Sequence, residues 1–257
     1  MAPQLEGTLL QNNMLTKGII YYTDNLLDLK IATAVQDQLV KMSISKNMAL
    51  TSSSLRRMHF GTKNIFFPHL RRGEVTMFKQ ILGGLENSTS DVVFFCEHDV
   101  LYHSSHFDFT PSSDNFFYYN KYFYKTNIKS GCATRHYSVQ TSGLCAWREL
   151  LIGHYRTRIA ICEKNAAVAA AAGVPDWRGG YKSSMRYEPG NQKTGKIDDI
   201  MALTWRSEFP NIDIRHDHNL TAYNKALEDW RNRKYSQGYL ETDHIPGWGK
   251  VGGLVKL

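Results

Sequence analysis

Two acidic residues directly after an apolar run are the sharpest chemical feature of this sequence. The run 92–96 is followed by Glu97, His98 and Asp99. A strand buried on both faces has this continuous apolar pattern, and ligands of open α/β sheets bind at the carboxyl ends of the strands. Two carboxylates at such an edge suit Mg²⁺ or Mn²⁺, ions that also bind nucleotide phosphates. The alternative is that both are ordinary loop acids.

Imidazole and apolar side chains alternate near the end of the sequence. Residues 211–217 predict a late strand, and at a period of two Ile212, Ile214, His216 and His218 share one face. A histidine that continues an apolar face is a candidate third metal ligand. The alternative for either histidine is a hydrogen-bonded core residue.

An acidic pair, Asp198 and Asp199, precedes the apolar positions of a predicted helix over 200–209. One aspartate at such a place caps the helix. The other is then available as a general base, which accepts the proton of a hydroxyl on a sugar-like acceptor.

The elements that must position these residues alternate along the chain. Apolar and β-branched runs predict strands, and apolar positions three and four residues apart predict helices. The strands are expected at 17–23, 48–52, 64–67 and 91–96, and the helices at 26–42 and 73–85. A strand that turns into a helix is expected over 142–152, an alanine-rich helix over 166–173, and a further helix over 197–209. This order predicts an α/β fold with a mostly parallel central sheet flanked by helices.

The composition is that of a globular protein. Of 257 residues, 42% are hydrophobic and 21% charged, which excludes a mainly disordered chain, a collagen-like chain and a disulfide-dense mini-protein. No interdomain linker is evident, so a single domain over 1–257 is expected. The four cysteines form no CxxC pair, which argues against a zinc module. Because Cys96 lies within an apolar run that predicts a buried strand, reduced thiols in a cytoplasmic protein are expected. The small apolar run 166–174 is far shorter than a membrane helix, so no transmembrane segment is expected.

Taken in order, these features resemble the GT-A glycosyltransferases, and most nearly the inverting family 2 type. The resemblance covers about 17–221 and implies a Rossmann-like GT-A domain. It implies a nucleotide-sugar-binding half over about 15–110, an acceptor and catalytic half over about 111–225, and a basic tail over 226–257. Glu97-His98-Asp99 stands where the family has a DxD motif and departs from it at the first position.

The resemblance also implies roles for single residues. Tyr22, Thr23 and Asp24 would hold the base and ribose of the donor, Lys79 would face the nucleotide, and Gly143 would lie near the donor sugar; Glu97 and His98 are further nucleotide contacts. A histidine, His216 or His218, would complete a metal shell with Glu97 and Asp99. The base would be Asp199, or as second choice Asp198.

The function that follows is metal-dependent transfer of a sugar from a nucleotide diphosphate sugar, most often a UDP-sugar, to a hydroxyl, with inversion. The cofactor is Mn²⁺ or Mg²⁺, and the basic segment 176–195 is either a lid over the donor or a solvated surface loop. Two alternatives stay open, a nucleotide-binding protein without turnover and a metal-dependent nucleotidyltransferase.

The acceptor is the least determined partner. A glycan or small-molecule hydroxyl is the first expectation. The second is a hydroxymethylated base in DNA, as for phage enzymes that act in the host cytoplasm. The second is motivated by the net charge of +7 and by basic stretches at 55–57, 70–72 and 230–234.

Overall fold

A seven-stranded sheet lies at the centre of the computed structural model, which describes residues 15–128, 130–136, 139–173, 188–189, 202–216 and 241–255. Its strands follow the spatial order β10-β6-β9-β4-β1-β2-β3. All are parallel to one another except β9, which is antiparallel to both neighbours. The predicted mostly parallel sheet is therefore confirmed. The strands are β1 (Lys17–Thr23), β2 (Ala49–Ser54), β3 (Lys63–Phe66), β4 (Val92–Glu97), β6 (Phe117–Asn120), β9 (Leu144–Trp147) and β10 (Ala202–Trp205).

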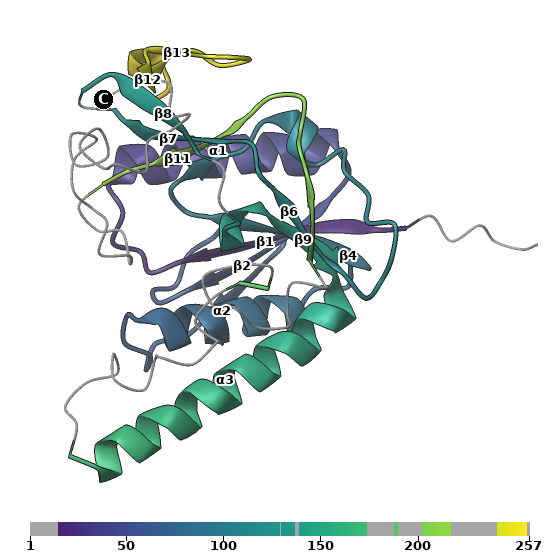
Figure 1. Ribbon diagram of the computed structural model, residues 1–257, viewed down its shortest axis with the longest axis vertical. Helices are drawn as coiled ribbons and strands as arrows, with labels where there is room; N and C mark the ends of the chain where they lie inside the picture. Colours follow the sequence, from purple (N-terminus) through teal and green to yellow (C-terminus); the bar gives the residue numbers. More distant parts are fainter. Residues whose placement is uncertain are drawn as a thin grey trace, which may run out of the picture.

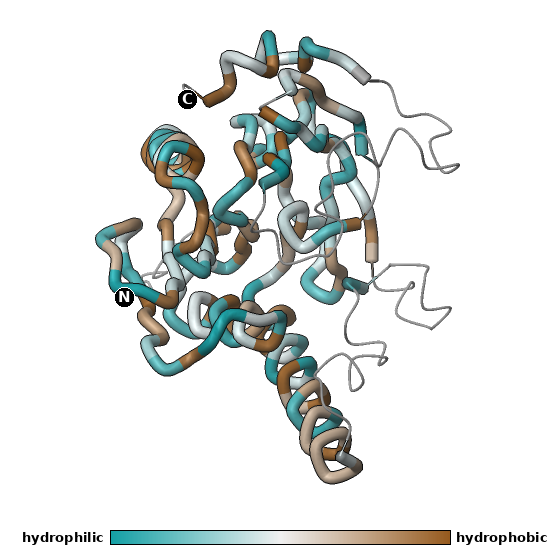
Figure 2. The backbone as a smooth tube through the Cα atoms, turned by 90° about the vertical axis from the view of Figure 1, so that its left-hand side faces the viewer, coloured by the Kyte–Doolittle hydropathy of each residue, from teal (hydrophilic) through white to brown (hydrophobic). Residues whose placement is uncertain are grey.

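Helices cover both faces of this sheet (Figure 1). Helix α1 (Leu29–Ser45) lies on one face, and α2 (Glu74–Glu86) and α3 (Arg148–Ala171) lie on the other. The carboxylate of Asp28 caps α1 by accepting a hydrogen bond from the backbone of Lys30 at 2.9 Å. The predicted alanine-rich helix is the last part of α3, whose C-terminal end extends away from the body of the molecule (Figure 2).

The core is divided by the central sheet into two layers. Alternate residues of β1 and β4 face opposite sides, so Ile19 and Phe94 pack toward α1 while Ile20 and Phe95 pack toward α2 and α3. All four side chains are fully buried. Gly84 lets α2 approach the sheet, because a Cβ there would lie 2.8 Å from a methyl carbon of Ile20.

A second, five-stranded sheet lies on the α1 side of the molecule (Figure 1). Its spatial order is β12-β8-β7-β11-β5, with β11 parallel to β7 and antiparallel to β5. Its strands are β5 (Val100–Leu101), β7 (Phe123–Asn127), β8 (Cys132–His136), β11 (Asn211–Ile214) and β12 (Glu241–Thr242). A short hairpin of β13 (His244–Ile245) and β14 (Gly249–Lys250) and the 3₁₀ turns η1 (Ser104–His106), η2 (Thr141–Gly143) and η6 (Val251–Gly253) complete the described elements.

A buried histidine joins the two sheets. The Nδ1 atom of His106 accepts hydrogen bonds from the side-chain amides of Asn120, at the end of β6, and Asn211, at the start of β11, at 3.0 and 3.1 Å. Two amide donors at Nδ1 place the ring proton on Nε2. Burial lowers the pKa of His106 to about 3, so the ring is neutral.

The predicted helix over 197–209 is wrong where the structure describes it. Residues Ala202–Trp205 form β10, an edge strand parallel to β6, and Trp205 stacks on Phe109 with ring centroids 4.1 Å apart. A short apolar run does not distinguish strand from helix by its period, and here pairing with β6 decides.

The cysteines and the helices bear on the expected reduced thiols and on the expected absence of a transmembrane segment. None of the four cysteines forms a disulfide. Within the described ranges, every helix is too short or too polar to cross a bilayer.

Candidate functional site

The acidic motif and the first loop lie together at the carboxyl edge of the central sheet. Strands β1 and β4 are adjacent and parallel, with Tyr22 opposite Glu97. The hydroxyl of Tyr22 donates a hydrogen bond to Glu97 Oε1 at 2.9 Å. Thr23 is the last residue of β1 and Asp24 follows it, while His98 and Asp99 follow β4, so the two loops leave the sheet side by side.

Three side chains at this edge lie close enough together that they could hold a metal ion. The ligand atoms of His98, Asp99 and His216 all lie within 4.8 Å of one another. The Nε2 atom of His216 is 3.2 Å from Asp99 Oδ2. Two imidazoles and a carboxylate suit a divalent first-row transition metal. The structure thus brings Asp99 and His216 together, as sequence reasoning expected, and adds His98, which had been assigned to the nucleotide.

Pairing between β5 and β11 brings His216 to Asp99. The chain leaves β4 at Glu97 and enters β5 at Val100, which pairs with Asp213 of β11. The backbone carbonyl of Asp99 accepts a hydrogen bond from the amide of Ile214 at 2.8 Å. Asp99 thus belongs to the junction between the two sheets, and the end of β11 lies against it.

Neighbouring polar groups orient the ring of His98. The hydroxyl of Thr23 lies 2.7 Å from its Nδ1, and Asp24 Oδ1 lies 3.6 Å from the same atom. Asp24 is itself held by Arg72, whose Nε is 2.6 Å from Oδ2. Such contacts leave Nε2 as the nitrogen for a metal. Burial lowers the pKa of His98, which favours the neutral imidazole that binds metals.

The two carboxyl groups of the motif differ in charge. Burial, and next the negative charge of Asp99, raise the pKa of Glu97 to about 8. For Asp99 burial acts in the same direction, but the hydrogen bond with His216 and nearby positive charge outweigh it and hold the pKa below its usual value. Asp99 therefore carries the negative charge near neutral pH, while Glu97 keeps its proton beside Tyr22. A role of Glu97 as a metal ligand stays a prediction.

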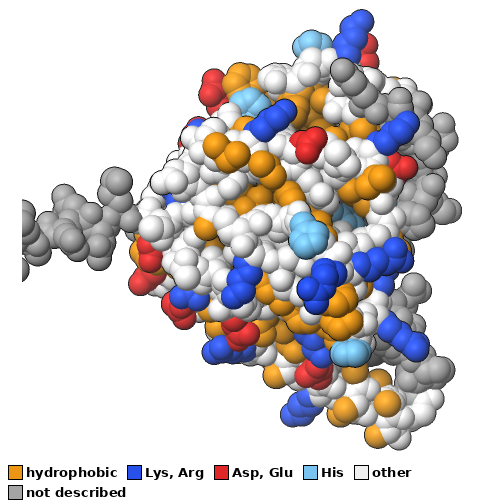
Figure 3. Space-filling view, turned by 180° about the vertical axis from the view of Figure 1, so that it is seen from behind, with side chains coloured by type: hydrophobic (Ala, Val, Ile, Leu, Met, Phe, Trp, Pro, Cys, Tyr) orange, Lys and Arg blue, Asp and Glu red, His pale blue; other side chains and the backbone are white. Residues whose placement is uncertain are grey.

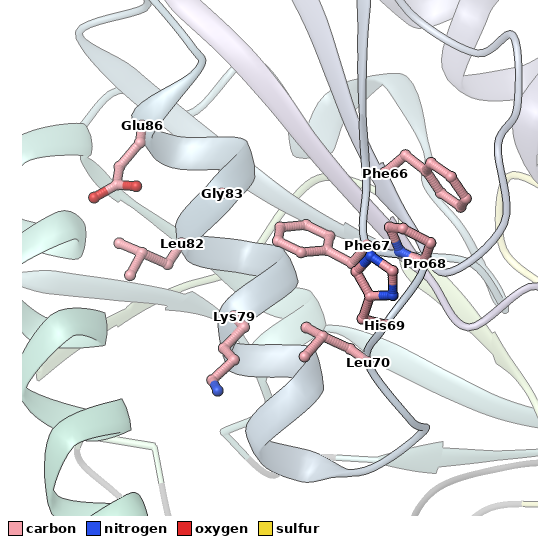
Figure 4. Close-up of a pocket in the computed structure, with 9 residues that line it drawn as sticks. All are labelled: Phe66, Phe67, Pro68, His69, Leu70, Lys79, Leu82, Gly83 and Glu86. Atoms are coloured by element: carbon pink, nitrogen blue, oxygen red, sulfur yellow. The ribbon is translucent and has the colours of Figure 1, made fainter.

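Lys79 and Gly143, which the resemblance assigns to the donor nucleotide and sugar, have contacts within the protein itself. Lys79 Nζ is 2.6 Å from Glu163 of α3. It lines a groove of about 500 Å³ between α2 and the segment after β3, together with Leu82 of α2 and Phe67 across from it (Figure 4). Gly143 lies in η2, where a Cβ would meet the carbonyl oxygen of Asn120 at 2.7 Å.

The remaining predicted site residues fall outside the described ranges. These are Asp198, Asp199 and His218, and all of the segment 176–195 except Glu188 and Pro189. Glu188 is buried and forms an ion pair with Arg158 of α3 at 2.6 Å.

Comparisons with known proteins yield distant structural likenesses. No protein-family model matches the sequence, and no curated protein matches it. The structure is similar to a glycosyltransferase involved in the glycosylation of the major capsid of PBCV-1, with a TM-score of 0.41 and 8% identity, over 74% of this chain and 82% of that one.

Two structures of Drosophila β1,4-galactosyltransferase 7 are also similar. The catalytic domain in complex with xylobiose gives a TM-score of 0.35 and 14% identity over 56% of this chain. A mutant in complex with manganese, UDP-Gal and xylobiose gives 0.36 and 14% over 55%. This chain covers 52% of each of these two structures. With TM-scores this low, the likenesses do not establish an activity for this chain.

Proposed function

We propose that this chain is a metal-dependent glycosyltransferase that moves a sugar from a nucleotide diphosphate sugar to an acceptor hydroxyl. The observation that supports it is the convergence of His98, Asp99 and His216 at the carboxyl edge of a mostly parallel sheet. Tyr22 and Thr23, which the resemblance to GT-A enzymes assigns to the base and ribose, contact Glu97 and His98 directly. The proposed metal site and the proposed nucleotide-binding residues thus share one edge.

The described residues fit a divalent ion by the chemistry of their donors. Asp99 supplies the anionic oxygen, His98 and His216 supply neutral nitrogens, and Thr23 fixes the ring of His98. Two nitrogen ligands favour Mn²⁺ over Mg²⁺, which prefers oxygen. When bound, such an ion offsets the charge that develops on the diphosphate of the leaving nucleotide.

The finer steps follow the resemblance. Asp199 is the proposed base, with Asp198 as second choice, and either would take the proton of the acceptor hydroxyl. The hydroxyl then attacks the anomeric carbon from the face opposite the leaving group, so the transfer inverts the anomeric centre. A UDP-sugar is the proposed donor.

The proposed acceptor is a glycan or a small-molecule hydroxyl. A DNA acceptor is the second expectation, drawn from the basic stretches. Of these, 230–234 lies outside the described residues, and in 70–72 the carboxylate of Asp24 pairs with Arg72 and offsets its charge. On the face drawn in Figure 3, several basic side chains lie beside acidic or hydrophobic ones. The positive charge of the described stretches is thus offset in part.

The test is release of nucleotide from a panel of sugar nucleotides, with Mn²⁺ and with a chelator. We expect one donor to be consumed only with the metal, and Asp99→Ala to lose at least a hundredfold in rate. Asp108→Ala is the matched control, because Asp108 is an exposed acid that pairs with Lys46 on another part of the surface. Its rate should equal that of the wild type.

The outcome separates the alternatives. Nucleotide binding without release of sugar from any donor would indicate a binding protein. Release of pyrophosphate from a nucleoside triphosphate would indicate a nucleotidyltransferase. Turnover that survives both the chelator and Asp99→Ala would refute the metal site.

A further inference from the structure

Three charged side chains form a cluster on the second sheet, next to the metal-binding residues. Lys125 of β7 lies opposite Asp213 of β11 in the strand register. The Lys125 Nζ atom is 3.9 Å from Asp213 Oδ2, and one guanidinium nitrogen of Arg215 is 3.0 and 3.3 Å from the two carboxylate oxygens. One carboxylate thus holds two cationic groups, and we call these residues the Lys125–Asp213–Arg215 cluster.

The cluster adjoins the metal-binding residues both along the chain and across a strand pair. Arg215 directly precedes His216, and Asp213 pairs with Val100, the residue after Asp99. Between Asp213 and Arg215, the backbone amide of Ile214 donates a hydrogen bond to the carbonyl oxygen of Asp99 at 2.8 Å. The two cationic groups therefore lie beside the proposed ion site.

Desolvation makes these charges strong. The side chains of Lys125, Asp213 and Arg215 are 17%, 9% and 13% exposed. Charges that are mostly removed from water interact several-fold more strongly than charges on an open surface. A guanidinium also offers two parallel donors to phosphate oxygens, while an ammonium group acts as a compact point charge.

We propose that Lys125 and Arg215, held by Asp213, form an anion subsite for the diphosphate of the metal–nucleotide complex. This inference rests on the proposed function and assigns it two further binding residues. The two cationic groups would contact the diphosphate next to the ion that His98, Asp99 and His216 would hold. Asp213 is then a positioning residue, since it touches the cationic groups and not the ligand.

The test measures binding of inorganic pyrophosphate to the Mn²⁺-loaded protein by calorimetry. We expect Lys125→Met and Arg215→Met each to weaken pyrophosphate binding at least tenfold. We expect Asp213→Asn to weaken it less, because both cationic groups remain. Binding of Mn²⁺ alone, followed by electron paramagnetic resonance, should not weaken in Lys125→Met or Arg215→Met, because each substitution removes a positive charge near the proposed ion site.

Matched controls separate this effect from loss of any ion pair. Lys46→Met removes the lysine paired with Asp108, and Arg156→Met removes the arginine whose Nη2 is 2.7 Å from Glu86. Both controls should bind pyrophosphate like the wild type. Lys125→Arg and Arg215→Lys keep the charge, so they should recover most of the affinity. Lys125→Gln and Arg215→Gln, which also remove the charge, replace the methionine variants if those fail to fold.

Three results would overturn the inference. The first is that the Mn²⁺-loaded wild-type protein binds no pyrophosphate. The second is that both charge-removing variants keep the wild-type affinity for pyrophosphate. The third is that these variants lose Mn²⁺ affinity in parallel, because the cluster would then have a structural role. Failure of the proposed function is a different result. Wild-type protein would then bind pyrophosphate through these side chains and yet turn over no sugar donor.

Discussion

The buried ring of His106 should make the stability of the protein depend on pH in a predictable way. Its Nδ1 accepts from the amides of Asn120 and Asn211, so it ties together β6 and the strand that leads to His216. Its ring is fully buried, and Trp205 stacks on it with centroids 5.5 Å apart. A proton on Nδ1 would remove both hydrogen bonds and place a charge among aromatic rings.

The sign and the size of the effect follow from the two pKa values of His106. Burial lowers the pKa in the folded protein to about 3, while an unfolded histidine has a value of about 6.5. Above about pH 6.5 the ring is neutral in both states and contributes no pH dependence. Below it, the unfolded chain binds a proton that the native ring refuses, so the free energy of unfolding falls by about 1.4 kcal/mol per pH unit. Between pH 7.5 and 5 the loss is about 2 kcal/mol.

The assay is urea unfolding of the wild type and of His106→Gln at pH 7.5 and at pH 5. Glutamine keeps a carbonyl oxygen that can accept from the amides but has no proton to gain. Other buried groups, such as Glu97 and His154, also titrate, so the informative quantity is the difference between the two proteins. The variant should lose about 2 kcal/mol less than the wild type over this range.

A control variant addresses the effect of general destabilisation. Ile20→Val removes one methyl group from the buried core and should cost about 1 kcal/mol at both pH values. If His106→Gln and the wild type lose the same free energy between pH 7.5 and 5, the ring is not held neutral, and the described role of its two amide partners is incorrect.

Three further substitutions test other parts of the structure. Thr23→Val removes the 2.7 Å contact that orients His98 and should weaken Mn²⁺ binding about 10- to 100-fold, measured by electron paramagnetic resonance with unfolding as a check. Glu188→Gln leaves the buried guanidinium of Arg158 without its carboxylate and should lower the free energy of unfolding by about 3–5 kcal/mol, measured in urea. Gly143→Ala places a Cβ 2.7 Å from a backbone carbonyl oxygen and should cost about 1–3 kcal/mol, seen as a lower melting temperature.

The parts of the fold that the sequence predicts well have long and clear patterns. The strand at Lys17–Thr23 has its predicted bounds, and α2 begins one residue after its predicted start at Gly73. The strand is a continuous run of β-branched and aromatic residues, and the helix has apolar positions three and four residues apart, so in both elements the local pattern agrees with the burial. The parallel order of these strands follows from the helices between them.

The prediction fails where an element is short and depends on a distant partner. Ala202–Trp205 has too few residues for a period, and it is a strand because β6 offers a free edge. For the same reason no sequence pattern predicts β5, because it has only two residues and is a strand through its pairing with β11. The five-stranded sheet was thus not predicted as a sheet, although the strand at its member β11 was expected.

Because this sheet was not predicted from the sequence, His98 was not recognised as a possible metal ligand. The sequence shows an acid, a histidine and an acid after a strand, and a continued strand would direct the two acids to one face and the histidine to the other. The chain instead passes from β4 into β5 at this point. Glu97 stays with Tyr22 in the central sheet, while Asp99 is bonded through its backbone to β11 and lies near His216. One carboxylate therefore lies in the central sheet and the other at the junction with the second sheet. The passage of the chain from β4 into β5 leaves His98 beside Asp99 and not beside Glu97.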